Sequence, residues 1–301
     1  MHPSLPVSSN PTSASSPVLQ ALGAVVDYGE RTILQGLDLA VHAGEIYALL
    51  GANGAGKTTT LSLFLGFVRP RSGQVRVQGV DPVTAAAQAR GLIAYIPENV
   101  ALYEHLSARE NVAYLLDLAG QPASRDAIGQ ALSAAGLDAA AHDRRVSGFS
   151  KGMRQKVAIA LALARKVPAL LLDEPTSGLD PQATAEFSRL ITQLRGQGVA
   201  ILMVTHDLLG AADVADRMGF IAGGRLVEEV AARGEERFDV RALHRHYAGT
   251  GTGASASADA NANANANANA HAHAHAHAHA HAHADADADA DADAGVQGAA
   301  A

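Results

Sequence analysis

One short segment restricts what this chain can fold into more than any other. Residues 51–58 read Gly-Ala-Asn-Gly-Ala-Gly-Lys-Thr and fit the pattern G-x-x-x-x-G-K-[ST]. The apolar segment Glu45–Leu50 precedes them and a helical apolar series follows from Lys57 to Val68, so the pattern lies between a predicted strand and a predicted helix. Glycines let successive backbone N–H groups converge on one point, which the positive end of the helix also faces. The sequence therefore predicts an anion-binding loop in an α/β domain.

The residues of this loop suit the phosphates of a nucleotide. Lys57 can reach the β- and γ-phosphates, and the Thr58 hydroxyl can bind Mg²⁺. A Gly-rich loop with a merely solvated lysine is the alternative, and the strand–loop–helix order argues against it. The residues expected to contact the nucleotide are Gly51, Ala52, Asn53, Gly54, Ala55, Gly56, Lys57, Thr58 and Thr59.

Two acidic residues follow a second apolar strand. The sequence Leu170–Leu172 continues into Asp173 and Glu174. A parallel strand beside the one that feeds the loop would bring Asp173 next to Thr58. Asp173 could then hold Mg²⁺ through water, and Glu174 could polarise an attacking water. Taken alone, two solvated acids at a strand end would be the commoner reading, but the loop 115 residues upstream of Asp173 favours the paired site.

Composition excludes several classes of protein. Cysteine is absent, which rules out disulfides, Cys-ligated zinc, iron–sulfur clusters and thiol catalysis. The net charge of the 301 residues is −7, but six of the 30 acids and none of the 23 basic residues follow residue 250, so residues 1–250 carry 24 acids against 23 bases, a net of −1. That near-neutral body argues against nucleic acid as a partner. The sequence has no run of 18 apolar residues, so we expect no membrane-spanning helix. Residues 1–17 read as a disordered leader rather than a secretory signal.

The remaining pattern alternates strands and helices. Residues 18–50 and 74–78 read as short strands, and residues 101–166 as several short helices. Ala169–Leu172 and Val199–Val204 are near-continuous apolar runs, typical of parallel strands buried on both faces. Between them, Pro181–Leu194 reads as a helix capped by Asp180. A hairpin is expected at residues 220–230, followed by a charged extension at 233–250.

Three further segments follow in a fixed order. Residues 147–155 read Ser-Gly-Phe-Ser-Lys-Gly-Met-Arg-Gln, residues 177–180 read Ser-Gly-Leu-Asp, and residues 205–207 read Thr-His-Asp. With the loop and the paired acids, they resemble the ATP-binding cassette (ABC) family of ATPases. The resemblance covers about residues 18–232 and implies a P-loop NTPase cassette with an antiparallel β subdomain and a helical subdomain at about 101–166. It also implies ATP and Mg²⁺ as the bound groups.

The resemblance assigns roles position by position. Residues 149–153 are similar to the family's signature L-S-G-G-Q, of which this chain keeps Ser150 and Gly152 but has Phe149, Lys151 and Met153 at the other positions. In the family this segment faces the ATP of a second subunit, so that two cassettes close over two nucleotides. A serine and backbone N–H groups at a helix start can bind a γ-phosphate.

Other matching positions carry weaker signals. Asp180 matches the loop that touches the partner subunit, and His206 matches the histidine that contacts the γ-phosphate. A lone histidine is more often structural, and only the order of the segments favours a role for His206. Tyr28 matches the aromatic residue that stacks on adenine, with an ordinary strand-end tyrosine as the alternative.

Another departure from the family pattern also changes a charge. The family usually has glutamine after the strand expected at Leu92–Ile96, and this chain has Glu98. Glu98 can still order the metal or the water, but it adds a negative charge near Asp173. The resemblance thus names Glu174 as the base, with Lys57, Glu98 and His206 beside it, and Thr58, Asp173 and Glu98 as groups near the metal.

The resemblance implies an ATP-hydrolysing subunit that energises a separate membrane permease, in the direction of export. Its partners would be that permease and a second cassette, in a homodimer, and its location the cytoplasmic face of the plasma membrane. Residues 95–100 also look similar to the ATPase of transporters that assemble the copper sites of nitrous-oxide reductase, which stays as an alternative. A soluble ABC ATPase acting on nucleic acid or ribosomes, and a metal-buffering protein with an inactive cassette, are two further alternatives.

The chain ends in a low-complexity segment over residues 251–301. Residues 254–294 alternate Ala with Ser, Asn, His and Asp, which offers no apolar face and predicts disorder. Repeat expansion is one origin. The alternative is binding of Ni²⁺, Cu²⁺ or Zn²⁺ by the seven histidines between His271 and His283.

Overall fold

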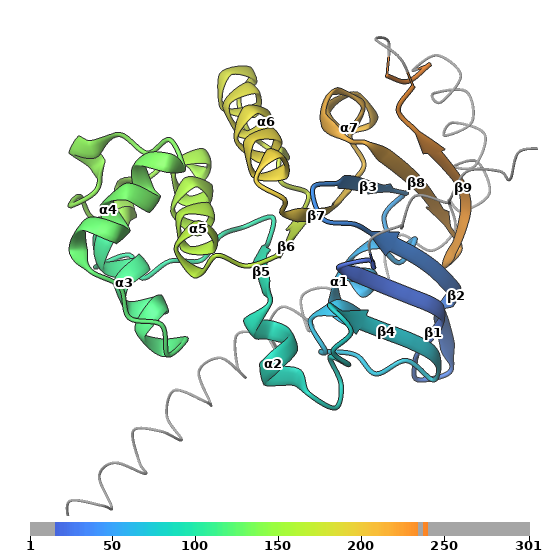
Figure 1. The fold of residues 1–301 in the computed structure, drawn as a ribbon. Helices are drawn as coiled ribbons and strands as arrows, with labels where there is room; N and C mark the ends of the chain where they lie inside the picture. The colour runs from blue at the N-terminus through green and yellow to red at the C-terminus, as the bar shows by residue number, and fades with distance from the viewer. Residues whose placement is uncertain (1–15, 234–236, 240–301) are drawn as a thin grey trace, which may run out of the picture. The chain divides into compact units, whose positions relative to one another are not determined.

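The computed structural model describes residues 16–233 and 237–239, and a six-stranded sheet lies at its centre (Figure 1). Its strands run in the order β5 (Ile93–Ile96), β6 (Ala169–Asp173), β7 (Ala200–Thr205), β3 (Ile46–Leu50), β8 (Arg217–Ala222) and β9 (Arg225–Ala231). The first five are parallel, and β9 pairs antiparallel with β8 in the expected hairpin.

A second, antiparallel sheet has the order β2 (Arg31–Val41), β1 (Leu19–Tyr28) and β4 (Ser72–Val77). Helix α1 (Lys57–Phe64) contacts strands of both sheets. Its side chains Leu61, Leu63 and Phe64 are buried in one apolar cluster with Leu19 and Leu34 of the small sheet. This sheet is the antiparallel β subdomain that the resemblance implies.

Residues 101–166 hold helices, as the sequence predicts. They form α3 (Ala108–Leu118), α4 (Arg125–Ala134) and α5 (Lys151–Arg165), with two short 3₁₀ turns at Ala139–Ala141 and Val146–Gly148. The side chains of Ser107, Ser124 and Ser150 cap the three α-helices. Figure 1 shows the three packed together at one end of the large sheet.

Three more helices complete the described chain. The first two are α6 (Pro181–Gly196), which starts at the predicted Asp180 cap, and α2 (Ala86–Gly91). The third is α7 (Leu208–Val214), which, like α2, the sequence did not predict.

The expected end of the helix that starts at Lys57 is wrong. Helix α1 ends at Phe64 rather than at Val68. Gly66 has a left-handed φ of 70° and lies against Pro82, where a Cβ would collide with the proline backbone.

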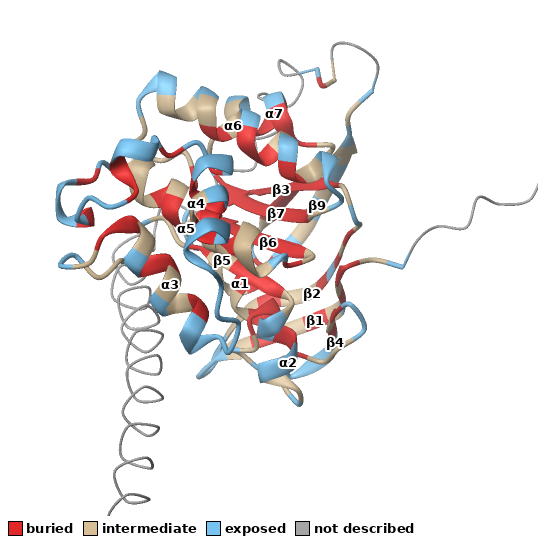
Figure 2. Ribbon diagram, turned by 60° about the vertical axis from the view of Figure 1, so that its left-hand side comes forward, coloured by how far each residue is buried: buried red, intermediate tan, exposed pale blue. Residues whose placement is uncertain are grey.

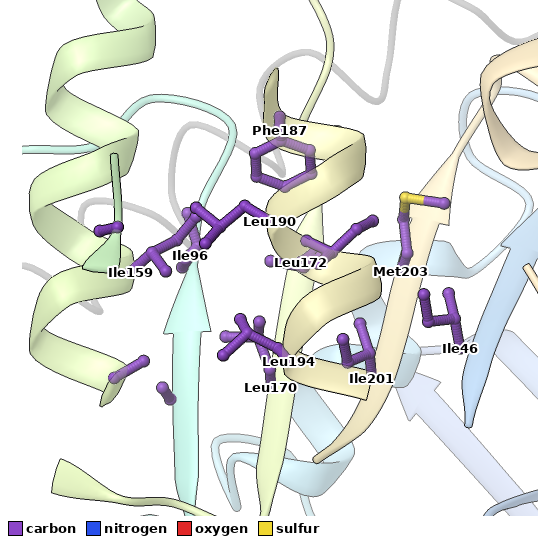
Figure 3. Close-up of a cluster of buried hydrophobic side chains, with 14 of the residues drawn as sticks. Ile46, Ile96, Ile159, Leu170, Leu172, Phe187, Leu190, Leu194, Ile201 and Met203 are labelled. Atoms are coloured by element: carbon purple, nitrogen blue, oxygen red, sulfur yellow. The ribbon is translucent and has the colours of Figure 1, made fainter. Parts of the chain in front are cut away.

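The large sheet is buried on both faces, and alternate residues of each strand pack into different clusters. Leu170, Leu172, Ile201 and Met203 face the helical side, where Phe187 and other residues of α6 cover them (Figure 3). The residues between them, such as Leu171 and Leu202, face α1 and the small sheet. Figure 2 shows these strands mostly buried between α6 and α7 on one side and β1, β2 and β4 on the other. Two-sided burial explains the continuous apolar runs of the sequence.

The strand register brings three carboxyl ends together. Leu50 of β3 pairs with Thr205 of β7, and Asp173 of β6 pairs with Val204 of β7. The expectation that β6 lies directly beside β3 is wrong, because β7 lies between them.

No helix within residues 16–233 and 237–239 is both long and apolar enough to cross a membrane. Residues 1–15 of the expected leader, most of the 233–250 extension and the whole 251–301 segment lie outside the described residues, as do the histidines considered for metal binding.

Candidate functional site

The loop of residues 51–56 is shaped by glycines that nothing larger could replace. A Cβ on Gly51 would lie 2.6 Å from the carbonyl oxygen of Ile221 in β8. Gly56 has a left-handed φ of 112°, and a Cβ there would lie 2.6 Å from Cδ2 of Leu34 in β2. The two sheets therefore press the loop into its curve, and only glycine avoids the clash at both ends.

The first turn of α1 keeps its backbone donors free of side-chain caps. Gly56 is the N-cap residue and makes no side-chain cap hydrogen bond, whereas Ser107, Ser150 and Asp180 each cap a helix with a side-chain oxygen. The N–H groups at the start of α1 can therefore bind an anion placed in the loop.

Lys57 is buried at this helix start, with its side chain only 7% exposed. Its Nζ donates to the carbonyl oxygen of Gly51 at 2.7 Å and lies 3.3 Å from Oε1 of Glu174. The ammonium group is thus held beside the loop by one carbonyl and one carboxylate. A phosphate in the loop would lie within reach of the same cation.

Asp173 lies at the end of β6, between a threonine and a tyrosine. Its Oδ2 accepts from the Thr58 hydroxyl at 3.5 Å and from the Tyr95 hydroxyl at 3.3 Å. Burial raises the pKa of Asp173 to about 6, and the nearby Glu174 carboxylate adds to that rise. A divalent cation would favour the ionised carboxylate instead.

These oxygens are a suitable donor set for Mg²⁺. Mg²⁺ prefers oxygen ligands and is usually held by one or two protein groups together with substrate phosphates. Thr58 and Asp173 supply a hydroxyl and a carboxylate at hydrogen-bond distance from each other. Within the part of the chain that the structure describes, no three His, Cys, Asp or Glu side chains gather as a ready metal cluster.

Glu174 is held by three neighbouring groups. Its Oε2 accepts from the Thr205 hydroxyl at 3.0 Å, from the backbone N–H of His206 at 3.2 Å and from Nδ1 of His206 at 2.9 Å. The residue has a left-handed φ of 44°, which turns it toward β7. Burial acts to raise the pKa of Glu174, but the hydrogen bond from His206 and the charge of Lys57 outweigh it, and the pKa is lowered.

Two other predicted residues lie close to this centre. Tyr28 lies at the end of β1, half exposed, and its hydroxyl interacts with Thr59 of α1, so it stands beside the loop. Glu98 follows β5, and its Oε1 accepts from the Ser177 hydroxyl at 2.9 Å and lies 3.8 Å from Nζ of Lys151.

The remaining predicted residues form a second group between α5 and α6. The Ser150 hydroxyl accepts from the N–H of Met153 at 3.3 Å, and Oδ1 of Asp180 accepts from Ala183 at 2.8 Å. Both residues border a pocket that Gly152 also lines. A Cβ on Gly152 would make only ordinary contacts at 3.5 Å or more, so packing within this chain does not require glycine there.

Comparison with known proteins gives the family of this chain. The family model described as ABC transporter matches residues 34–177. The Nod factor export ATP-binding protein I of Paraburkholderia xenovorans is 37% identical over 206 residues, which cover 68% of this chain and 67% of that protein. This chain belongs to the ABC transporter ATP-binding family.

Other members of the ABC transporter family show how wide the likeness is. The 2-aminoethylphosphonate import ATP-binding protein PhnT of Salmonella typhimurium is 36% identical over 247 residues, which cover 78% of this chain and 64% of that protein. The solved dimeric structure of the bacterial ABC transporter cassette MJ0796 is 27% identical, covers 72% of this chain and 99% of its own, and has a TM-score of 0.63. The cassette fold expected from the sequence is confirmed.

Three residues of this ABC cassette site make contacts that the sequence did not predict. They are Tyr95, which bonds to Asp173; Thr205, which bonds to Glu174; and Ser177, which bonds to Glu98. Tyr95 pairs with Leu171, two residues before Asp173, so the tyrosine and the aspartate share a face of the sheet. That relationship depends on the strand register, which no pattern within β5 alone specifies.

Proposed function

We propose that this cassette binds ATP with Mg²⁺, hydrolyses it, and thereby energises a separate membrane permease. The observation that carries the proposal is the convergence of four side chains beside the loop of residues 51–58, the phosphate-type loop. They are Lys57, Asp173, Glu174 and His206. A buried cation, an uncapped helix start and two carboxylates are the groups that phosphoryl transfer to water requires.

The residues of the chain would divide the work as follows. Lys57 and the loop N–H groups bind the β- and γ-phosphates, while Thr58 and Asp173 hold Mg²⁺, whose charge offsets that of the phosphate oxygens. Glu174 accepts the proton of the attacking water, whose oxygen bonds to the γ-phosphorus as the bond to the β–γ bridging oxygen breaks. ADP and phosphate are the products.

Glu174 is not free to act as a base in the arrangement described above. Lys57 and His206 both bind its carboxylate. A γ-phosphate in the loop would compete with Glu174 for Lys57 and for His206. One oxygen of Glu174 would then be available to water. Nucleotide binding would therefore assemble the base rather than meet one already exposed.

The second group of residues suits a partner cassette. Ser150, Gly152 and Asp180 line one pocket between α5 and α6, and the side chains of Ser150 and Asp180 accept the cap hydrogen bonds of their own helices. The MJ0796 cassette, solved as a dimer, is similar in fold. We infer that a second copy of this chain receives these residues on its own bound ATP, with Tyr28 stacking on adenine within each copy.

We propose the permease partner and the location from membership of the family. ABC transporter cassettes pair with membrane permease subunits, so we expect this cassette to lie at the cytoplasmic face of the membrane that holds its permease. For the direction of transport we propose export, as in the Nod factor relative; the import relative gives the competing outcome. Uptake or efflux of candidate substrates in vesicles that contain the permease decides between them.

The decisive experiment measures phosphate release by the purified full chain with ATP and Mg²⁺, alone and with its permease. Glu174→Gln should bind ATP, form an ATP-dependent dimer by light scattering, and turn over at least about a hundredfold more slowly, because the general base is lost. Wild-type turnover in that variant would remove Glu174 as the base. A wild-type chain that is inert toward ATP even with its permease would overturn the proposal.

A further inference from the structure

Two side chains of opposite charge meet where the loop after β5 approaches the start of α5. Nζ of Lys151 lies 3.8 Å from Oε1 of Glu98, and the Ser177 hydroxyl donates to the same oxygen at 2.9 Å. The side chain of Lys151 is 26% exposed and that of Glu98 is 46% exposed, so the pair lies at the rim of the site rather than inside it. Three segments that are distant in the sequence thus converge on one carboxylate oxygen.

These are the two positions at which the chain departs from the family pattern in charge. The pattern has glutamine where this chain has Glu98, and glycine where it has Lys151. Either change alone alters the charge of the site by one unit. Together they leave the net charge unchanged, and the structure shows that the two added charges contact each other.

The charge at this place acts on the metal-side carboxylate. Glu98 is close enough to Asp173 for its negative charge to help raise the pKa of Asp173, after the larger effects of burial and Glu174. An uncompensated Glu98 would therefore attract a divalent cation more strongly and repel the triphosphate. A compensated Glu98 would do neither.

We propose that Lys151 is a positioning residue that neutralises Glu98, so that the Glu98–Lys151 pair serves the Mg²⁺–nucleotide site as an uncharged glutamine would. Ser177 fixes the shared carboxylate oxygen. The pair also ties the loop after β5 to the residue that follows Ser150, so the two halves of the site are linked by one contact. The inference rests on the proposed function, because it concerns the nucleotide at that site.

The test measures binding rather than turnover. A fluorescent ATP analogue is titrated into the full chain, first without Mg²⁺ to obtain nucleotide affinity, then with rising Mg²⁺ to obtain half-saturation. Lys151→Ala, which keeps helix propensity, should weaken metal-free nucleotide binding and lower the Mg²⁺ half-saturation, each by about two- to fivefold for a partly exposed charge. Glu98→Gln should shift both quantities in the opposite directions. The double variant should return both to near the wild-type values.

Controls separate charge compensation from loss of structure. Lys156→Ala removes a cation from the same helix and is the control. Nζ of Lys156 lies 2.7 Å from Oε2 of Glu186 in α6, so this variant should shift neither quantity. Lys151→Arg keeps the charge and should bind like wild type. Melting temperatures show whether each variant is folded, and the shifts should shrink as salt is raised, since they are electrostatic.

Opposite shifts that cancel in the double variant would support the pair. Single variants that shift in the same direction, or a double variant worse than both, would overturn it. Binding by wild type without cancellation refutes only this inference, whereas a wild type that binds no nucleotide overturns the proposed function as well.

Discussion

Nζ of Lys57 lies 3.3 Å from Oε1 of Glu174, and the two side chains are 7% and 14% exposed. This buried pair joins the phosphate-type loop to the carboxylate that follows β6. Burial of two charges is tolerated because each also has other partners, the Gly51 carbonyl for the lysine and Thr205 with His206 for the glutamate. The groups that would bind phosphate and activate water therefore neutralise each other in this arrangement.

Lys57→Ala should cost both nucleotide affinity and stability. It removes the cation of the loop, so ATP affinity should fall by at least about tenfold. It also leaves Glu174 buried without its opposite charge, which costs about 3 kcal/mol of unfolding free energy for a buried pair that loses one member. Urea unfolding and fluorescent nucleotide binding measure the two effects.

Lys156→Ala is the matched control, because its partner Glu186 is more exposed than Glu174 and the pair lies on the helical side. That variant should lose less than about 1 kcal/mol and keep wild-type nucleotide affinity. Unchanged ATP affinity in Lys57→Ala would show that residues 51–58 are not the phosphate site.

Asp173→Asn should change how stability depends on pH. The pKa of Asp173 is raised, mainly by burial, from 3.8 to about 6, so the folded chain holds this proton more tightly than the unfolded chain. The proton's contribution to stability is complete below the unfolded pKa and is lost as the pH rises through about 6. Asparagine has no such loss, so its advantage over aspartate should grow to on the order of 3 kcal/mol at neutral pH.

Urea unfolding of both proteins between about pH 4.5 and 7.5, without Mg²⁺ or nucleotide, tests this linkage. Parallel pH profiles would show that Asp173 has an ordinary pKa. With Mg²⁺ and ATP the order should reverse, since the charged carboxylate binds the cation more strongly than the neutral amide does.

The sequence predicted the strands of the large sheet because their environment leaves a local trace. Runs such as Leu170–Leu172 are apolar throughout, since alternate residues face two different cores. It did not predict that β7 separates β6 from β3, because a run buried on both faces carries no record of its neighbours. Likewise, α1 ends at Phe64 through a contact between Gly66 and Pro82, which the periodicity of residues 57–68 does not contain.

The site divides in the same way. The loop at residues 51–58, the acids at 173–174 and His206 were predictable because each lies in a contiguous motif with a fixed order. Tyr95 and Thr205 were not, because their contacts with Asp173 and Glu174 arise only when neighbouring strands take up their register. The Glu98–Lys151 contact was hidden because it joins the loop after β5 to the start of α5, two segments that are far apart in the sequence, although both departures were visible there.

Tyr95→Phe should weaken the metal side of the site without touching the loop. The Tyr95 hydroxyl donates to Oδ2 of Asp173 at 3.3 Å and lowers the pKa that burial raises. Without that donor Asp173 should hold its proton more firmly, and Mg²⁺–nucleotide affinity should fall by about tenfold, as for other groups that orient a metal ligand. Metal-free nucleotide binding should not change. Tyr114→Phe on α3 is the control, and equal losses in both variants would contradict the assignment.

Leu172→Ala separates packing from binding. Leu172 is fully buried at the face of β6 covered by α6 (Figure 3), so a cavity should remain and the unfolding free energy should fall by about 2–5 kcal/mol. Leu118 on α3 is 56% exposed, and its alanine variant should lose less than about 0.5 kcal/mol. Added Mg²⁺ and ATP should raise the melting temperature of Leu172→Ala as they do in wild type, since ligand linkage depends on affinity and not on the core. A Leu172→Ala protein that gains nothing from the nucleotide, as Lys57→Ala should, would mean that this strand sets the site geometry as well as the stability.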